Sequence, residues 1–377
     1  MKRILSITFL NSFVSGGVTL IIPLLLLDRN IDLIEIGIII SVLPLVFFIV
    51  RILFAALADL KGWNRFYLLV NWPASLFSTL IFVVANSTPF FLLGKLVEAV
   101  KESSYWGVNR TAIFSLSPQK EGKEATKNIA VLSLGTAIGS AVAGIGISYF
   151  GFSIAISVFV VASIIIGIPA ALLWRTPKQK IKTKTCKVKD LLNPKGRGRK
   201  FWFVSFIALF FSLSRYPILN LLLPVFMVQE LGYSYVTIGI AYLLYRLTSS
   251  IVTFGTLKTS LGLRRVIFQS SIAIFAFLLL SNSNGYFLVL FLLLALAEGF
   301  GVGFFESIIA KATKRSVCIS VDIGLLLIPM RLAEFLSILF AGFIVESMGY
   351  LPIFVLSGVF FFIFSGLSWY FLRVKDN

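Results

Sequence analysis

Long apolar blocks dominate this chain and limit what it can fold into. Each block runs for about 18 to 25 residues, the length at which an α-helix crosses the roughly 30 Å hydrocarbon core of a bilayer. Charged residues make up only 13% of the 377 residues, about half the share found in soluble domains. The pattern predicts an all-α polytopic membrane protein. We place twelve spans at residues 4–27, 33–57, 66–86, 89–114, 128–148, 153–174, 201–227, 236–257, 266–281, 287–310, 317–345 and 351–372.

The polar stretches between the spans indicate the orientation. If the N-terminus is cytoplasmic, 26 of the 34 Lys and Arg residues lie on the cytoplasmic side, seven lie within spans and Arg29 alone lies outside. An excess of Lys and Arg in cytoplasmic loops is the usual bias of membrane proteins. We therefore expect a multi-pass protein of the cell membrane with both termini in the cytoplasm. The same bias explains the net charge of +18, so nucleic acid is not expected as a partner.

The longest predicted loop, residues 175–200, carries 11 basic residues and one acidic residue. A basic cytoplasmic loop of this kind rests on anionic lipid headgroups. It divides the chain into an N-terminal six-helix bundle, residues 1–174, and a C-terminal six-helix bundle, residues 201–377.

The composition also excludes several kinds of chemistry. The sequence has no histidine, so proton transfer would have to use carboxylates. Its two cysteines, Cys186 and Cys318, lie in or beside basic loops and imply no disulfide framework. The sequence contains no Gly-x-x-x-x-Gly-Lys-Ser/Thr loop for ATP and no catalytic His, Cys or metal constellation. We therefore expect no enzymatic activity, no cofactor and no metal.

The two halves of the chain resemble each other at an offset of about 200 residues. Residues 55–65 align with residues 255–265 without a gap, and both segments have Leu, Gly and Arg at equivalent positions. Glu98 and Glu298 correspond at the same offset. Two repeated halves with a site between them near the bilayer midplane are a known plan of transporters.

The loop after the second span carries a family resemblance. Residues 55–65, AALADLKGWNR, resemble the Gly-x-Leu-Ala-Asp-Arg-x-Gly-Arg-Lys-Arg signature of the major facilitator superfamily. Residues 95–99 resemble that family's Arg-x-x-Gln-Gly in the fourth span. Residues 135–144 resemble its antiporter glycine motif without the Pro, and we expect these glycines to allow close helix packing. The resemblance implies two pseudo-symmetric six-helix bundles around a central cavity.

The resemblance also implies a gate on the cytoplasmic side. Asp59, Gly62, Arg65 and Arg110 are its candidate residues, and the Asp59 carboxylate would cap the N-terminus of the eleventh span, where free N–H groups favour negative charge. The sequence departs from the signature at three positions, with Ala55 in place of Gly, and Leu60 and Trp63 in place of Arg. These changes weaken the basic part of the expected lock.

Charged side chains inside the predicted spans are the strongest pointers to function, because each costs several kcal/mol in hydrocarbon unless it is paired or hydrated. None falls in the third, sixth, ninth or twelfth span, which the resembled fold exposes to lipid. Those near the cytoplasmic ends, Arg51, Arg110, Glu306 and Asp322, suit structural or gating roles. The full set is Arg51, Lys95, Glu98, Lys101, Glu102, Arg110, Arg215, Arg246, Glu298, Glu306, Asp322, Arg331 and Glu334.

The fourth span concentrates these charges on one face. At about 100° per residue, its polar residues from Lys95 to Asn109 fall within an arc of about 120°. The spacing allows mutual neutralisation by i,i+3 and i,i+4 pairs, but it equally suits a path for a proton or a polar solute. The candidates for proton coupling are Glu98, Glu102 and Glu298. The candidates for substrate binding are Lys101, Arg215, Arg246, Arg331, Glu334, Asn11 and Tyr242.

The sequence favours a secondary active transporter that moves a small polar or anionic solute by alternating access, coupled to protons. Its expected partners are that solute, a proton or other coupling ion, and membrane lipids, and we expect a monomer. Two alternatives remain open. An aromatic content of 15% and the partial glycine motif allow efflux of amphipathic compounds, and a non-transporting sensor of the same fold is the other.

Overall fold

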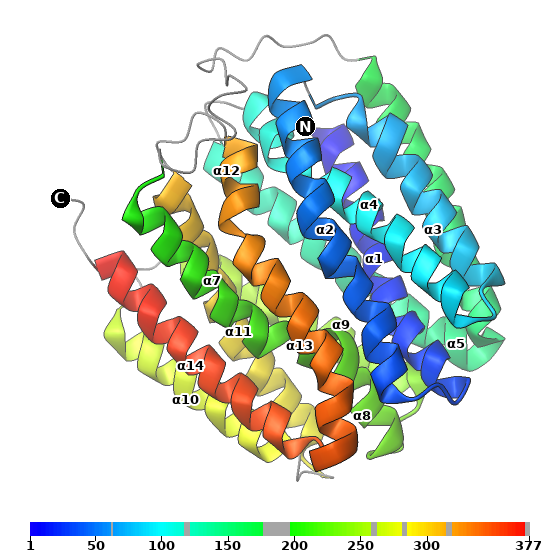
Figure 1. Cartoon of the computed structure of the whole chain (residues 1–377), viewed down its shortest axis with the longest axis vertical. Helices are drawn as coiled ribbons and strands as arrows, with labels where there is room; N and C mark the ends of the chain where they lie inside the picture. Colours follow the sequence, from blue (N-terminus) through cyan, green and yellow to red (C-terminus); the bar gives the residue numbers. More distant parts are fainter. Residues whose placement is uncertain are drawn as a thin grey trace.

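The computed structural model describes residues 1–61, 63–116, 121–175, 197–257, 262–280, 285–313 and 319–373. These residues form helices joined by short connections (Figure 1). The helices are α1 (Lys2–Asp28), α2 (Leu33–Lys61), the π-helix η1 (Tyr67–Asn71), α3 (Trp72–Val84), α4 (Thr88–Leu116), α5 (Glu121–Trp174), α7 (Arg199–Pro217), the π-helix η3 (Ile218–Leu222), α8 (Leu223–Gln229), α9 (Tyr235–Leu257), α10 (Leu263–Leu280), α11 (Phe287–Thr313), α12 (Ile319–Leu326), α13 (Ile328–Met348) and α14 (Leu351–Arg373).

All twelve predicted spans coincide with helix over their described residues, although the seventh and the eleventh are interrupted. Gly151, with a φ of 77° that favours glycine, separates the two spans that make up α5. Pro217 is followed by η3, where the seventh span shifts to π-helical turns. Leu327 separates α12 from α13 within the eleventh span. Residues 176–196 of the predicted linker lie outside the described residues.

Nine helical stretches within the described residues are long and apolar enough to cross a membrane, and one of them, residues 127–174, contains two spans. α4 and α10 are not among these nine. α4 carries the charged stripe that the sequence predicts. The helical architecture of a multi-pass membrane protein is therefore confirmed.

Two six-helix halves lie side by side, with α1–α5 on one side and α7–α14 on the other (Figure 1). The halves meet mainly where α2 packs on α13 and where α5 packs on α9. The beginning of α1 and the end of α14 lie toward one end of the molecule, which we call the terminal end. The other end, where α1 connects to α2 and α13 connects to α14, we call the opposite end.

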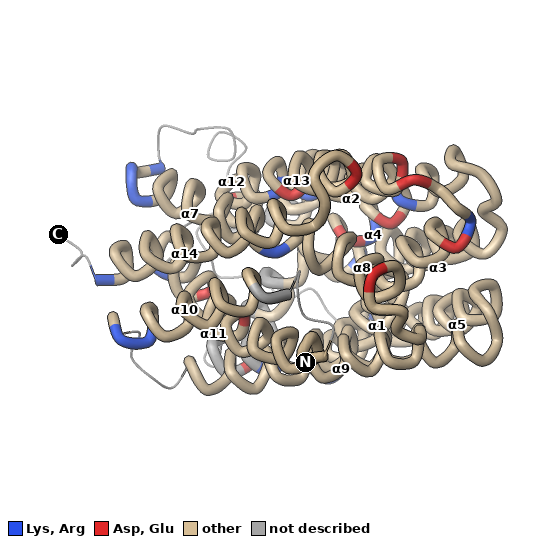
Figure 2. Tube along the Cα trace, turned by 90° about the horizontal axis from the view of Figure 1, so that it is seen from below, with Lys and Arg blue, Asp and Glu red and all other residues tan. Residues whose placement is uncertain are grey.

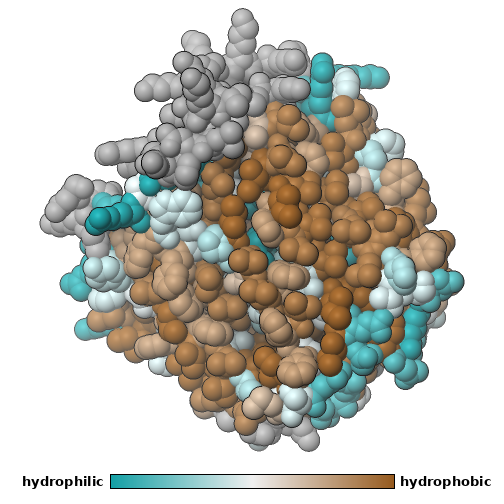
Figure 3. All heavy atoms as spheres, viewed as in Figure 1, coloured by the Kyte–Doolittle hydropathy of each residue, from teal (hydrophilic) through white to brown (hydrophobic). Residues whose placement is uncertain are grey.

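The helices without charged residues in the predicted spans present large apolar side chains to the outside. Phe77 on α3, Ile168 on α5, Phe268 on α10 and Phe362 on α14 are each between 56% and 63% exposed. The surface in the view of Figure 1 is accordingly apolar over most of its area (Figure 3). Exposure on this scale suits contact with hydrocarbon rather than water.

Glycines bring α5 against helices on both of its sides. A Cβ atom at Gly139 would overlap the carbonyl oxygen of Phe13 on α1, and one at Gly144 would overlap that of Tyr235 on α9 and lie 2.8 Å from the Cα of Gly239. The expectation that this glycine motif serves close helix packing is confirmed.

Candidate functional site

The predicted stripe on α4 is buried and forms ion pairs. Lys95 Nζ lies 2.8 Å from Glu98 Oε2, and each of these side chains is no more than 4% exposed. Lys101 Nζ lies 3.0 Å from Glu102 Oε1, and the Glu102 side chain keeps 16% exposure. Because an unpaired charge is costly to bury, this pairing is what allows the four side chains to lie inside the helix bundle. Glu102 is the more exposed of the two acids of the stripe.

Ser15 on α1 links the second of these pairs. Its hydroxyl accepts a hydrogen bond from Lys101 Nζ at 2.6 Å and donates one to Glu102 Oε1 at 2.6 Å. Trp106 Nε1 donates to the other Glu102 oxygen at 3.0 Å. Hydrogen bonds to an ionised carboxylate stabilise its charged form, so Glu102 is held in place by three neighbours.

Asn11 is linked to the backbone of the charged stripe through hydrogen bonds, rather than to the charged side chains themselves. Its amide donates to Asn71 Oδ1 at 2.8 Å, and Asn71 in turn donates to the backbone oxygen of Lys101 at 3.1 Å. The Asn71 side chain lies at the end of η1. The structure thus places Asn11 in a buried amide pair that supports α4.

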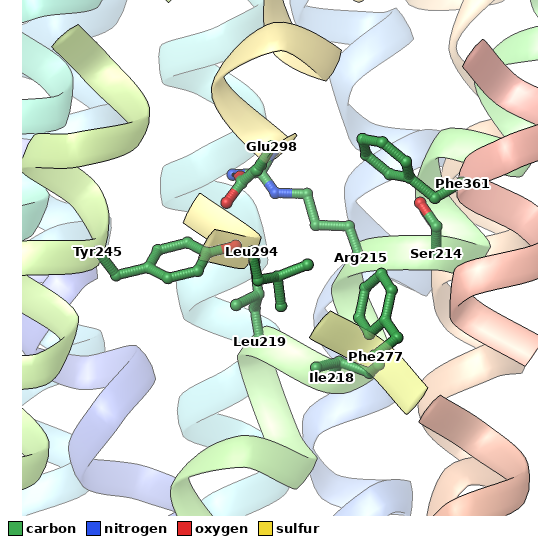
Figure 4. A pocket seen from close by; sticks show the side chains of 9 residues that line it. All are labelled: Ser214, Arg215, Ile218, Leu219, Tyr245, Phe277, Leu294, Glu298 and Phe361. Carbon is green, nitrogen blue, oxygen red and sulfur yellow. Dashed lines mark ion pairs between the residues drawn. The ribbon is translucent and has the colours of Figure 1, made fainter. Parts of the chain in front are cut away.

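A second charged cluster lies in the other half, around Glu298 on α11. Glu298 Oε1 pairs closely with Arg215 of α7, and Arg246 Nη1 of α9 lies 3.9 Å from the same oxygen. Figure 4 shows Arg215 reaching toward Glu298, with Tyr245 approaching from α9. A small gap adjoins the cluster. One carboxylate therefore serves two guanidinium groups from two other helices.

Tyr242 is close to this cluster but is engaged with the backbone. Its hydroxyl donates to the carbonyl of Leu219 in η3 at 2.9 Å. That carbonyl is available because the helix changes to π-helical hydrogen bonding in this segment.

A third pair, Arg331 and Glu334 on α13, lies where the halves meet. The two side chains form a close ion pair. The Arg331 guanidinium also lies 4.3 Å from the ring centroid of Phe47 on α2. Glu102 of the first half interacts electrostatically with both members of this pair. Charges of the two halves therefore act on each other across the interface.

A small gap lies between the halves beside these charges. Lys95 lines it from the first half, and Asn220 and Glu334 line it from the second. The rest of its wall is formed by Thr19, Pro23, Ile40, Leu43, Pro44 and Ile338. Ionisable groups of both halves thus converge on a common space.

The predicted gate is described only in part. The side chains of Asp59 and Arg110, and the whole of Gly62, lie outside the described residues. The Arg65 guanidinium lies 5.4 Å from the ring centroid of Trp174, within its own half. At the terminal end α2 packs on α12 through Ala55 and Val321, so the second and eleventh spans do meet where the lock is expected.

At the opposite end a direct polar contact joins the halves. Glu346 on α13 accepts hydrogen bonds from the backbone N–H groups of Leu33 at 2.9 Å and Ile34 at 3.3 Å, in the first turn of α2. Gly37 and Gly342 lie at the same crossing, where a Cβ on Gly37 would be 3.0 Å from the carbonyl oxygen of Ile338. The sequence motifs gave no sign of this contact.

Sequence reasoning also missed the aromatic and amide residues that hold the charges. Phe47 carries no signal that separates it from the many Phe side chains in contact with lipid. Asn71 carried a usable signal, because a buried amide inside a membrane span requires a polar partner. No group of three or more His, Cys, Asp or Glu that could hold a metal occurs in the described parts of the chain.

Twelve spans in two halves, with ion pairs buried in each half and one of them, Arg331–Glu334, located where the halves meet, define a membrane transporter rather than a soluble domain. The family profile described as Major Facilitator Superfamily matches residues 4–268, and the chain belongs to this family of secondary transporters. No curated protein sequence matches the chain significantly.

Solved structures of similar fold include the nucleoside transporter NupG, with 13% identity, a TM-score of 0.75 and 99% of both chains covered. A bacterial homolog of the human lysosomal transporter Spinster, in an inward-facing and occupied conformation, has 15% identity and a TM-score of 0.74, with 99% of this chain and 96% of that chain covered. The unoccupied inward-facing form of that homolog has a TM-score of 0.75 at 15% identity, with 100% and 97% covered. At these identities the likeness concerns the fold alone.

Proposed function

We propose that this transporter moves a small polar solute that carries one negative charge, by alternating access coupled to protons. The observation that carries the proposal is the charge balance of the three central clusters. Among their described side chains, five are cationic (Lys95, Lys101, Arg215, Arg246 and Arg331) and four are acidic (Glu98, Glu102, Glu298 and Glu334).

Arg246 is the cation that is least neutralised. Its acidic partner within these clusters is the Glu298 oxygen that already pairs closely with Arg215, and its distance of 3.9 Å is the longest of these ion pairs. The side chain keeps 19% exposure, so a solute can reach it. A bound carboxylate or similar anion at Arg246 would balance the cluster. Lys101, Arg215, Arg331 and Glu334 would orient the rest of the solute.

The proton would be carried by carboxylates, because the chain has no histidine. Glu98, Glu102 and Glu298 are the candidates, and each is paired with a cation. Protonation of such a carboxylate releases its cation, so that proton binding and anion binding become linked. Glu102 combines this pairing with exposure and with an electrostatic link to the second half.

We further propose that the terminal end faces the cytoplasm of a cell membrane, that Asp59, Gly62, Arg65 and Arg110 gate that end, and that the chain works as a monomer. The distribution of Lys and Arg supports the orientation. The packing of α2 on α12 supports the place of the gate.

The test starts from a thermal-stabilisation screen of the purified protein with organic monoanions, zwitterions and neutral solutes, nucleosides included. Ligands that stabilise it are then followed in liposomes with an imposed pH gradient. Glu98→Gln and Glu102→Gln should each abolish gradient-driven accumulation but spare exchange, whereas the control Glu35→Gln, at the opposite end, should retain both. Normal accumulation in both variants would refute the proton role.

The anionic substrate has its own test. Arg246→Gln should lose binding of the monoanion, whereas a neutral analogue of the same size should bind the variant and the unmodified protein equally. If Arg246→Gln transports the anion normally, the charge argument fails even though the protein remains a transporter.

A further inference from the structure

A basic cleft opens at the terminal end of the second half, away from the central charges. It lies where α7 begins and where α11 and α14 end, and its empty volume, open solvent included, is about 920 Å³. Three cations and three aromatic residues line it, namely Arg199, Lys200, Lys311, Phe203, Tyr370 and Phe371. Figure 2 shows the basic ends of α7 and α14 on the same side of the molecule. The proposed transport mechanism uses none of these residues.

Among the residues that the structure describes, no acidic side chain lines the cleft. Neither α7 nor α14 contains an acidic residue. Asp322 on α12 is paired with Arg197 at 2.6 Å, and Glu306 on α11 does not line the cleft. The described lining of the cleft therefore consists of cations and aromatic residues, which suits an anion that also carries apolar groups.

Lys311 is fixed against one wall of the cleft. Its ammonium donates to the carbonyl oxygens of Phe371 at 3.3 Å and Leu372 at 3.5 Å, and it lies 5.2 Å from the ring centroid of Phe371. These contacts hold the charge at the end of α14, where a cation is favourable. The position of this cation is thus set before any ligand arrives.

Arg199 and Lys200 line the cleft from the first turn of α7. This turn contains no acidic residue, although cations at this end of a helix are electrostatically unfavourable. The usual excess of Lys and Arg in cytoplasmic loops explains why cations occur near this end. It does not explain why three of them, from two separate helices, line one cavity.

The aromatic residues of the cleft connect it to the lipid-facing surface. The Phe203 ring lies 6.4 Å from that of Tyr370 and 6.2 Å from that of Phe371. Tyr370 is 58% exposed, and Trp202 and Phe206 continue an exposed apolar face along α7 at 43% and 50%. Aromatic residues at this depth are typical of the membrane–water interface.

We propose that this cleft binds the headgroup of an anionic phospholipid, with its phosphate between Lys311 and the Arg199–Lys200 pair and its acyl chains along the exposed face of α7. A membrane lipid is the occupant that the cleft favours, because the cations lie above an apolar wall at the level where headgroups lie. Basic pockets between helices on the cytoplasmic side commonly bind such headgroups. The site is independent of what the protein transports.

The test compares lipid retention by the full chain in native mass spectrometry, with phosphatidylglycerol and phosphatidylcholine supplied in equal amounts. The unmodified protein should retain phosphatidylglycerol preferentially. The triple variant Arg199→Gln, Lys200→Gln, Lys311→Gln should lose this preference, by about fivefold for each cation removed. The matched control Lys2→Gln, Arg175→Gln, Arg264→Gln removes three exposed cations outside the cleft and should keep it. A preference that survives in the triple variant, or that falls equally in the control, overturns the proposal.

Two measurements on protein with an intact cleft complete the test. Brominated phosphatidylglycerol should quench the fluorescence of Trp202 more strongly than brominated phosphatidylcholine, with Trp202→Phe identifying its share of the signal. Equal quenching by both lipids would overturn the proposal even if the triple variant fails to fold. Inorganic phosphate should not displace the lipid at millimolar concentration, and full displacement would make this a free-phosphate site instead.

Discussion

The carboxylate of Glu346 accepts the backbone N–H of Leu33 at 2.9 Å, so that the end of α13 caps the beginning of α2. The two residues are 313 positions apart and belong to different halves. An acid at a helix N-terminus satisfies N–H groups that have no partner in the helix and interacts favourably with its dipole. The contact can exist only while the halves are together at the opposite end.

Removing this cap should favour opening of the opposite end. A cap is worth about 0.5–2 kcal/mol, so Glu346→Ala should shift the equilibrium toward separation by about 2- to 30-fold. The shift can be measured as the distance between spin labels at Asp28→Cys and Met348→Cys, after Cys186 and Cys318 are replaced by Ser. Glu35→Ala is the control, because Glu35 bonds Thr88 within its own half. An unchanged distance distribution in Glu346→Ala would show that the cap does not hold the halves together.

A methyl group at Gly144 should destabilise the packing of α5 on α9. Alanine in a helix usually gains about 1 kcal/mol over glycine, but here its Cβ would overlap the Tyr235 carbonyl, and overpacking costs about 1–3 kcal/mol. The net expectation for Gly144→Ala is a lower unfolding temperature. Gly366→Ala is the matched control, because no described atom lies within 4 Å of a Cβ there. Equal unfolding temperatures for the two variants would contradict the close contact.

Variants of the Arg215–Glu298 ion pair can distinguish a structural role of these charges from a role in transport. Arg215→Met alone leaves Glu298 with Arg246 at 3.9 Å and should lower stability, because breaking a buried pair costs up to about 3–5 kcal/mol. The double variant Arg215→Met, Glu298→Met should recover much of that loss, since apolar replacement of a whole buried pair is often neutral. Transport should nevertheless remain abolished. Normal transport by the double variant would mean that the pair only neutralises itself.

Phe47 should matter to the site through its ring. Arg331 lies 4.3 Å and Arg51 lies 5.5 Å from its centroid, and such cation–π contacts are worth about 0.5–2 kcal/mol. Phe47→Leu should therefore weaken substrate affinity by up to about 30-fold while the unfolding temperature changes little. Phe47→Tyr, which keeps the ring, should stay close to the unmodified protein. If Leu and Tyr bind substrate alike, the ring does not position Arg331.

Much of the fold could be predicted because a bilayer imposes strict rules on sequence. Apolar length gave all twelve spans, and the charge-free spans show large exposed apolar side chains, as expected of helices that face lipid. The break at Gly151 lies between the predicted fifth and sixth spans, as expected. The break at Leu327, inside the eleventh span, was harder to foresee, because one turn at a Leu leaves no distinct mark in a continuous apolar run.

The residues of the candidate site and the pairs within one helix could be predicted, but the pairs between helices could not. Because charged side chains are costly to bury inside a membrane, the sequence pointed to Glu98, Glu298 and their cationic neighbours. Local spacing found Lys95–Glu98 and Arg331–Glu334, because i,i+3 partners are set by helix geometry. The sharing of Glu298 by Arg215 and Arg246 depends on how three helices pack together, and one sequence carries no record of that. Glu98 and Glu298 occupy equivalent positions of the repeat yet have partners of different origin.

The close contact between the backbones of Gly144 and Gly239 bears on the rate of conformational change rather than on substrate affinity. Where helices interlock through side chains, many rotamers must change together before the helices can separate. This requirement raises the energy barrier to separation. Here two main chains face each other without any side chain between them. We therefore expect the crossing of α5 and α9 to open and close with few rotamer changes, so that exchange between conformations would be rapid although the contact in the closed state is tight.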